Sequence, residues 1–523
     1  MRKKLSFLLV FMLVILGISA CASDGIEVSD KKGNTGYIEE YRVAFGGDWG
    51  YPSPYSIVPR GPGFAYLQLV FDSLVWRDKD GNIVPQIAKE WEFDETKNQY
   101  IFTLQEGIKW HDYEDLNADD VVFTIEYMKE HRLPWLDIGA IKDARALDDK
   151  KVVISLNDYY TPFMNNIAMG MPIIPQHIFA DIDNPNLEYT EKILIGSGPY
   201  KLEEYSVEDG NYSFVAFDSY YQGDVKVEKL KFISMSKEMQ YSSILRGDVD
   251  MIMPSSDLID ALVDKGVNVG SSIGMVTKLR FNTEKAPFSS KNIRKALAYA
   301  INTEEIISIA QRGHGYKGES GLIPFNSRYY YGDVEKYDFD TRESDILMQR
   351  EGYEKKNDYY YKNGEELLIE IIGYEGVKRD IDVIANQLGQ AGFKTKSVYL
   401  DMATCDQRLN DGDFDIAVTE DGVTGDPVYL NRMMDSDVGD KFREENIDII
   451  NAINQQIYCK KESDRISLLK DIQKMYADSL PSYVLYYGKF NVAYNEKLEV
   501  YFTDEGYGVG VSLPYNKLMY IGE

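Results

Sequence analysis

The histidines are the first candidates for acid–base or metal chemistry in this chain, and their spacing predicts neither. The chain has four, His111, His131, His177 and His314, and none belongs to the HExxH pattern of a helical zinc site. His111 precedes Asp112, which has the composition of an acid–base pair, but we expect a structural role for all four. The sequence also lacks a G-x-S-x-G nucleophile elbow and a Walker phosphate loop. We therefore predict no enzyme, no resident metal and no cofactor.

Two aspartate pairs, Asp248 with Asp250 and Asp413 with Asp415, each follow a glycine. Such a glycine can end a helix, and the alternating spacing would put both carboxylates on one face of the strand that follows. We predict a turn that leads into a strand; a metal site, or an integrin-type RGD motif for the first pair, is the alternative. The stretch Asp78–Asn82 has some features of a calcium loop but lacks the closing glutamate, so we expect a plain turn.

A loop rich in glycine, proline and aromatic residues lies near the start of the globular part, at Gly46–Tyr55. Glycine lets a backbone approach a ligand closely, and the rings of Trp49 and Tyr51 offer stacking area. We expect this loop to line a ligand cleft. The alternative is a surface loop with a packed tryptophan.

The first 36 residues predict export and attachment to a membrane. Residues 1–20 join a basic start to an apolar run shorter than the roughly 20 residues of a spanning helix, so they indicate a signal peptide. Cys21 follows Ile-Ser-Ala, which resembles a bacterial lipobox, and is expected to carry diacylglycerol; an uncleaved anchor is the alternative. Two or three acyl chains hold a protein durably on a bilayer. The polar residues 21–36 predict a flexible tether.

Length and composition limit the classes of protein to consider. A chain of 523 residues is too long for one core, and we expect two to four domains. The formal charge of −28 repels nucleic acid and anionic membrane surfaces, so we exclude a nucleic-acid partner. Cys405 and Cys459 are too few for a disulfide framework, and we expect buried free thiols.

The middle of the chain has the clearest secondary-structure signal. Apolar residues up to Phe281 predict a strand, and a turn leads to a helix capped by Ser289 or Ser290. In this helix one apolar stripe is formed by Ile293, Ala296, Leu297, Ala300 and Ile301. Asn302 or Thr303 then caps a second helix. A strand that feeds helices in this way can join two lobes, or it can belong to one domain.

Several separated segments resemble the family 5 solute-binding proteins of ABC importers, the dipeptide, oligopeptide and nickel receptors. The longest ungapped one, RFNTEKAPFSSKNIRKALAYAINTEEII at 280–307, is similar to the hinge region of that family. Further segments are 70–128, with its WHDY and LNADDV sequences, the GSGPY stretch at 196–200, and 480–487. The resemblance covers roughly Val70 to Tyr487.

The resemblance implies an α/β fold of the periplasmic-binding-protein type II, cluster C, with two lobes joined by a hinge and an additional third domain. We predict these parts: signal peptide 1–20, tether 21–36, lobe I from 37–60, 190–278 and 488–523, extra domain II at 61–189, and the second ligand-binding lobe, lobe III, at 279–487.

The resemblance also implies where a ligand binds. Peptide-binding members of the family carry G-W-x-x-D where this chain has Gly422, Val423, Thr424 and Asp426, and their aspartate pairs with the α-amine of the peptide. Val423 replaces the tryptophan, which puts a standard dipeptide ligand in doubt, and Asp426 could instead begin an Asp-Pro turn. We expect the Trp49–Tyr51 loop to contact the ligand. Arg60 and Arg280 are candidates for a ligand carboxylate.

The function implied is a lipid-anchored receptor on the extracytoplasmic face of a cell membrane. We expect a monomer that captures a small ligand, first of all a peptide, between its lobes and delivers it to an ABC permease with its ATPase. An oligosaccharide is the next candidate ligand, since forty tyrosines offer stacking surfaces, and a nickel chelate follows. A surface adhesin or sensor without transport is the alternative of a different class.

Overall fold

The computed structural model describes residues 37–58, 61–423, 425–435, 447–500, 502–503 and 516–522. The chain divides into two units, Met1–Tyr37 and Ile38–Glu523, and the description below concerns the second. The predicted signal peptide and tether, with Cys21, lie outside the described residues. In the part of the chain that is described, no helix has both the length and the apolar character to cross a membrane.

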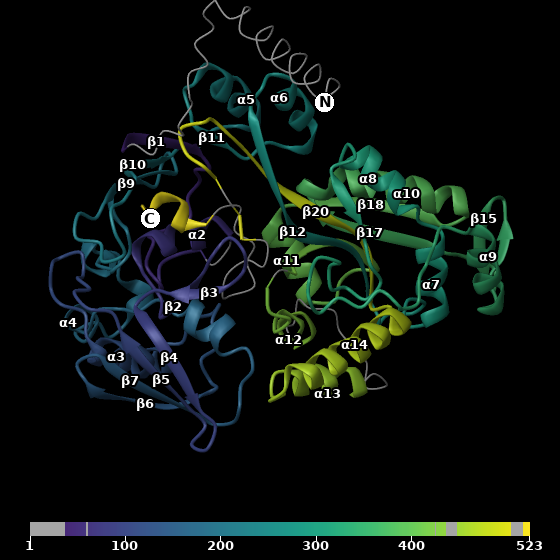
Figure 1. Cartoon of the computed structure of the whole chain (residues 1–523). Coiled ribbons are helices and arrows are strands. Elements are labelled where there is room, and N and C mark those ends of the chain that lie inside the picture. The colour runs from purple at the N-terminus through teal and green to yellow at the C-terminus, as the bar shows by residue number, and fades with distance from the viewer. Residues whose placement is uncertain are drawn as a thin grey trace, which may run out of the picture. The chain divides into compact units, whose positions relative to one another are not determined.

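An eleven-stranded mixed sheet runs through the second unit (Figure 1). Its ten-strand path is β18 (Lys394–Leu400), β17 (Leu368–Tyr374), β19 (Ile416–Gly422), β12 (Asn268–Phe281), β20 (Ser482–Tyr494), β11 (Met251–Ile252), β1 (Ile38–Ala44), β10 (Val227–Phe232), β9 (Asn211–Ala216) and β8 (Tyr200–Ser206). The short β13 (Gly315–Lys317) pairs with β20 off this path.

Two long antiparallel strands, β12 and β20, connect the halves of this sheet. Their register runs from Asn268 opposite Tyr494 to Arg280 opposite Ser482, with irregularities at two points. One end of β20 pairs with β11, and the opposite end of β12 pairs with β19. Figure 1 shows the two strands side by side in the centre of the molecule. Only these two strands therefore carry the ladder from one half of the sheet to the other.

The helices after β12 follow the predicted pattern. Helix α7 spans Lys291–Tyr299 with Ser290 at its N-cap, and α8 spans Thr303–Ala310. The side chain of Asn302 caps α8 by accepting a hydrogen bond from the backbone N–H of Glu305. The predicted stripe is fully buried: Ile293, Ala296, Leu297, Ala300 and Ile301 are at most 1% exposed. Burial of this face against β12 and β17 explains why the sequence pattern was reliable here.

Two further groups of helices complete this half. Helices α9 (Thr341–Arg350) and α10 (Lys378–Ala391) share a core with α7 and α8. A second core contains α12 (Tyr429–Asp435), α13 (Ile447–Gln456) and α14 (Glu462–Ser479). Helix α11 (Met402–Asn410) packs with β17 in a smaller cluster. Strands β14 (Glu354–Lys356), β15 (Tyr359–Lys362) and β16 (Glu365–Glu366) form a separate three-stranded sheet.

A four-stranded antiparallel sheet lies between β1 and β8 in the sequence. It consists of β4 (Ala88–Asp94), β5 (Gln99–Leu104), β7 (Lys151–Leu156) and β6 (Ile141–Asp148). Its helix α3 (Ala118–Glu130) follows the N-cap residue Asn117, which forms a complete capping box. The other elements are α2 (Gly61–Val70), β2 (Val75–Arg77), β3 (Ile83–Pro85), α4 (Gln176–Phe179), α5 (Lys237–Arg246) and α6 (Ile259–Asp264).

The motifs considered for metal binding are turns. Asp78 accepts hydrogen bonds from the backbone N–H groups of Asp80 and Asn82, which closes the β2–β3 hairpin without an ion. The expectation that each aspartate pair shares one face is wrong. The Asp250 side chain is 1% exposed and pairs with Arg42, whereas Asp248 is exposed and pairs with Arg246. Across the described residues, no three His, Cys, Asp or Glu side chains gather as metal ligands would.

Candidate functional site

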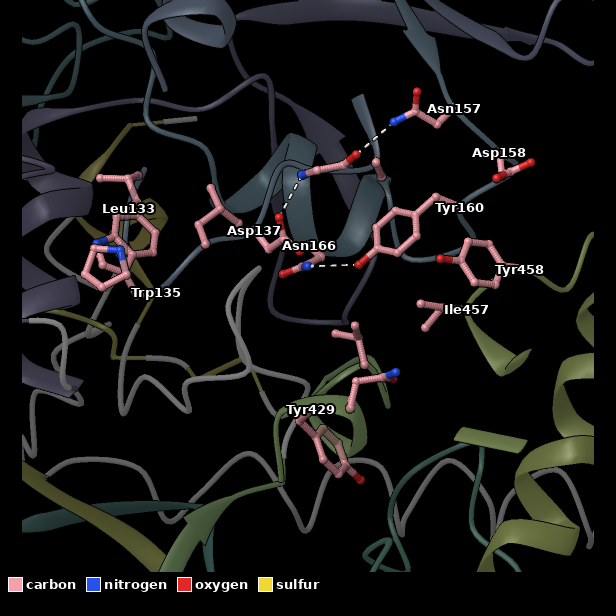
Figure 2. Close-up of a pocket in the computed structure, with 16 residues that line it drawn as sticks. Leu133, Trp135, Asp137, Asn157, Asp158, Tyr160, Asn166, Tyr429, Ile457 and Tyr458 are labelled. Carbon is pink, nitrogen blue, oxygen red and sulfur yellow. Dashed lines mark hydrogen bonds between the residues drawn. The ribbon is translucent and has the colours of Figure 1, made fainter. Parts of the chain in front are cut away.

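A cavity of about 740 Å³ lies between two separate parts of the chain. One wall comes from residues 133–166, next to the four-stranded sheet, and contributes Trp135, Asp137, Asn157, Asp158, Tyr160 and Asn166. The other wall comes from residues 428–431 and 457–458 and contributes Val428, Tyr429, Asn431, Ile457 and Tyr458. Figure 2 shows these side chains around the opening. Its size and its mixture of aromatic and amide groups suit a small organic ligand.

Local packing positions the first wall. The ring of Trp135 stands edge-to-face on Phe64 at 5.0 Å, and its indole N–H donates to the Pro54 carbonyl at 3.4 Å. Asp137 accepts a hydrogen bond from the backbone N–H of Gly139, and the Asn157 amide donates to the Gly139 carbonyl at 2.9 Å. These bonds hold two loops together, so the wall is formed before any ligand arrives.

Backbone contacts join the two walls at one edge of the cavity. The Thr161 N–H donates to the Ile457 carbonyl at 2.8 Å, and the Thr161 hydroxyl donates to the Cys459 carbonyl at 2.7 Å. These two bonds connect segments almost three hundred residues apart. The structure therefore describes a state in which the walls touch.

A buried ion pair lies behind the second wall. Arg465, on α14, donates from Nη1 to Oδ2 of Asp426 at 2.8 Å and from Nη2 to Oδ1 at 2.5 Å. The two side chains are only 1% and 2% exposed. Burial opposes ionisation of Asp426, but the Arg465 guanidinium outweighs it and keeps the pKa of this carboxyl below its usual range. The geometry is bidentate, which is the strong form of this interaction.

Asn165 connects this pair to the opposite wall. Its amide N–H donates to Oδ2 of Asp426 at 3.5 Å, and its carbonyl oxygen accepts from Arg77 on β2 at 2.9 Å. On the far side, Arg465 donates to Gln456 at 2.9 Å and to the Tyr329 hydroxyl at 3.3 Å. We call these six residues the Asp426 network. It bonds β2 and the first wall to α13 and α14.

The predicted ligand residues take different positions. Asp426 already accepts from Arg465, Asn165 and the Val428 N–H. Among the described residues these donors occupy both of its oxygens, so the role proposed for it toward a ligand amine stays a prediction that this geometry does not favour. Gly422 ends β19, and Val423 is 1% exposed within the α12–α14 core.

Of the other predicted residues, Trp49, Tyr51 and Arg280 are described and do not line the cavity. The backbone N–H of Trp49 donates to the Tyr212 hydroxyl, and the Tyr51 ring contacts Tyr205 at 5.2 Å, in the aromatic cluster beside β9. Arg280 is 3% exposed and lies over the Phe414 ring at the far end of β12. Arg60 and Thr424 lie outside the described residues, as does Cys21.

Sequence reasoning missed the residues that form the cavity. Trp135, Tyr160 and Tyr458 belong to no motif, so nothing in the pattern set them apart. Arg465 did have a signal: it falls on the apolar stripe of α14 with Leu469, Ile472 and Tyr476. An arginine on a buried stripe requires a buried anion as its partner.

The carboxyl group of Glu420, near the end of β19, is expected to make the stability of the fold depend on pH. Burial, together with the charge of Asp421, raises the pKa of Glu420 from 4.5 to about 7. Its oxygens accept from Thr277 and from the Tyr374 hydroxyl. The folded protein therefore binds this proton more tightly than the unfolded chain, and stability falls as pH rises from about 4.5 to 7, by up to about 1.4 kcal/mol per unit. We expect Glu420→Gln to remove this part of the slope in urea unfolding at pH 5 and pH 8; an unchanged slope would contradict it.

The chain has the mixed α/β fold of the cluster C periplasmic binding proteins, as predicted. A crystal structure of NikZ from Campylobacter jejuni in complex with Ni(L-His) matches it with a TM-score of 0.77 at 19% sequence identity. The match covers 92% of this chain and 99% of that one. At this identity the likeness establishes the fold alone.

The chain belongs to the bacterial extracellular solute-binding proteins of family 5. The family profile, which describes the middle part of these proteins, matches residues 82–441. The dipeptide-binding protein of Escherichia coli K12 is 28% identical over 300 residues, which are 52% of this chain and 56% of that protein. The oligopeptide-binding protein AppA of Bacillus subtilis is 23% identical over 528 residues, 96% of each chain. Membership in a family of solute-binding proteins also agrees with the prediction that the chain is no enzyme.

Proposed function

We propose that this protein captures a short peptide in the cavity between its two walls and delivers it to an ABC permease. The observation that carries the proposal is the cavity itself, with one wall from residues 133–166 and the other from residues 428–431 and 457–458, separate parts of the chain. The names of the two relatives, a dipeptide-binding and an oligopeptide-binding protein, support a peptide as the ligand class.

We also propose the domain division predicted above: lobe I from 37–60, 190–278 and 488–523, domain II at 61–189 and lobe III at 279–487. Its support is that β12 and β20 cross between the halves of the large sheet, as hinge strands would. A ligand that contacts both walls stabilises the closed state in proportion to its preference for closed over open. The permease would then recognise the closed form of a monomer.

Membrane attachment through Cys21 remains part of the proposal. Its support is the sequence alone, a short apolar run followed by Ile-Ser-Ala-Cys. The mass of the mature N-terminus tests this attachment directly, because a cleaved chain that begins with a diacylated Cys21 differs in mass from a chain that keeps its leader. Ligand roles for Trp49, Tyr51, Arg60, Arg280, Gly422, Val423 and Thr424 likewise stay predictions.

A nickel chelate is the second candidate ligand. The likeness to NikZ, crystallised with Ni(L-His), favours it. The described residues provide no cluster of three His, Cys, Asp or Glu side chains, so a metal would have to arrive with its own organic ligands. An oligosaccharide remains open because tyrosines and a tryptophan line the cavity.

Tryptophan fluorescence tests the proposed site. Trp135 lines the cavity, so trialanine should change its emission in a saturable titration, since a ligand displaces water from the ring. We expect Trp135→Phe to lose this change and Trp91→Phe, on β4 and outside the cavity lining, to retain it. A change that persists in Trp135→Phe would contradict binding in this cavity. Mass spectrometry of molecules that co-purify would then identify what does bind.

A further inference from the structure

The charged side chains that line the cavity are all acidic in the part of the chain that the structure describes. They are Asp137 and Asp158, both on the first wall. The described lining contains no lysine, arginine or histidine. Asp137 accepts one hydrogen bond, from the Gly139 N–H, which leaves its charge uncompensated. Asp158 is exposed to the opening. Among the described lining residues, a ligand anion would meet only like charge.

The buried basic group behind the second wall is already neutralised. Arg465 lies behind the second wall and is held by Asp426 in a bidentate pair. An ion pair that is closed on itself has little net charge to offer a ligand. Burial chiefly raises the pKa of Tyr160; the charges of Asp426 and Asp137 raise it further, and the Asn166 hydrogen bond and the Arg465 charge oppose them.

Aromatic rings stand beside the acids. Figure 2 shows Asp158, Tyr160 and Tyr458 on the same side of the cavity, with Tyr429 below and Trp135 opposite. Tyr458 is 51% exposed, so its face is available to a ligand. A cation over a tyrosine or tryptophan face is attracted by the ring quadrupole, and a nearby carboxylate adds Coulomb attraction. Rings and carboxylates together select for an alkylammonium or guanidinium group.

We infer that the cavity accepts a positively charged side chain of the bound peptide and rejects a side chain that ends in a carboxylate. This inference rests on the proposed function, and it names the ligand class that the function leaves open. The strongly acidic body, with a net charge of −28, would also favour the encounter with a cationic ligand.

The test is a matched series of tripeptides titrated into the full chain. Alanine is replaced at each position in turn by lysine, norleucine or glutamate, so that chain length is kept while the charge changes. At the position where the substitution has the largest effect, we expect the lysine peptide to bind roughly tenfold more tightly than the norleucine peptide. The glutamate peptide should bind more weakly than the norleucine peptide. The preference for lysine should shrink as NaCl rises from 20 to 500 mM, because salt screens exposed charges.

A pair of variants connects the preference to the cavity. We expect Asp158→Asn to reduce the affinity for the lysine peptide severalfold and so to narrow the preference for the lysine peptide over the norleucine peptide. Asp181→Asn is the matched control, since Asp181 is an exposed aspartate outside the cavity lining. Equal loss in both variants would mean that general charge, and not this site, selects the ligand, and would overturn the inference.

The outcomes separate the inference from the proposed function. If lysine, norleucine and glutamate peptides bind equally, the charge selection is wrong while the peptide receptor stands. Tighter binding of the glutamate peptide overturns the selection in the same way. If no tripeptide binds and cellobiose or Ni(L-His) does, the proposed peptide function fails and the inference fails with it.

Discussion

Replacing Arg465 with methionine is expected to lower the free energy of unfolding by about 3–5 kcal/mol. The cause is the buried charge of Asp426, which loses its partner. Asp426 has a side chain that is only 2% exposed, and without the guanidinium its charge is buried with only the weak bond from Asn165 and a backbone N–H. The measurement is the midpoint and slope of urea unfolding for the parent and the variant.

Two companion variants make this result specific. Arg465→Met combined with Asp426→Leu should recover much of the loss, because an apolar pair of similar volume carries no buried charge. Lys291→Met removes an exposed pair with Asp478 and should cost at most about 1 kcal/mol. If Arg465→Met unfolds like the parent, Asp426 does not depend on this partner. Its carboxylate would then be available to a ligand amine, as first predicted.

This ion pair also decides how a binding experiment on Asp426 is to be interpreted. Asp426→Ala leaves Arg465 buried without its partner, so the variant loses stability whether or not a ligand touches residue 426. A loss of peptide binding in that variant would not identify an amine contact. The double variant Arg465→Met with Asp426→Leu is expected to keep the second wall folded. Its affinity for trialanine therefore shows whether the ligand needs the Asp426 carboxylate.

The sequence was a good guide where one short segment determines its own structure. The helix after β12 begins after Ser290, one of the two predicted caps, and its apolar stripe is buried, although the Ser290 side chain makes no capping hydrogen bond. The turn at Asp78 is also as predicted, and the Asn117 capping box is a further motif of this local kind. In these cases the signal lies within one short segment, and the packing around it agrees with that signal.

The cavity could not be predicted in this way because its walls come from remote segments. Nothing in the residues around Tyr160 indicates that they meet Ile457 and Tyr458. The family motif directed attention to Asp426 and Val423, and both of these residues are buried in the folded protein. A motif reports that a position is constrained, and a buried ion pair constrains a position as strictly as a ligand does.

Replacing Lys517 with methionine is the second change expected to have a large effect, again about 3–5 kcal/mol of unfolding free energy. Lys517 and Asp72 are both 0% exposed, and Nζ lies 2.6 Å from Oδ1 of Asp72. The ammonium also lies 4.2 Å from the centre of the Trp76 ring. Burial lowers the pKa of Lys517, and the attraction of Asp72 opposes that shift. Without the lysine, Asp72 keeps hydroxyl and amide donors but no counter-charge.

The donors that remain set the size of this loss. Asp72 accepts from Tyr221 at 2.7 Å, from Tyr220 at 3.1 Å and from Gln86 at 2.8 Å. Lys497→Met is the matched control, since Lys497 also lies 2.6 Å from a buried aspartate, Asp250, but is 46% exposed. Asp250 retains Arg42 as a cation, so this control should lose much less. If both variants lose the same stability in urea unfolding, burial of the lysine is not the cause. If Lys517→Met loses nothing, the three neutral donors alone are sufficient to hold the Asp72 charge.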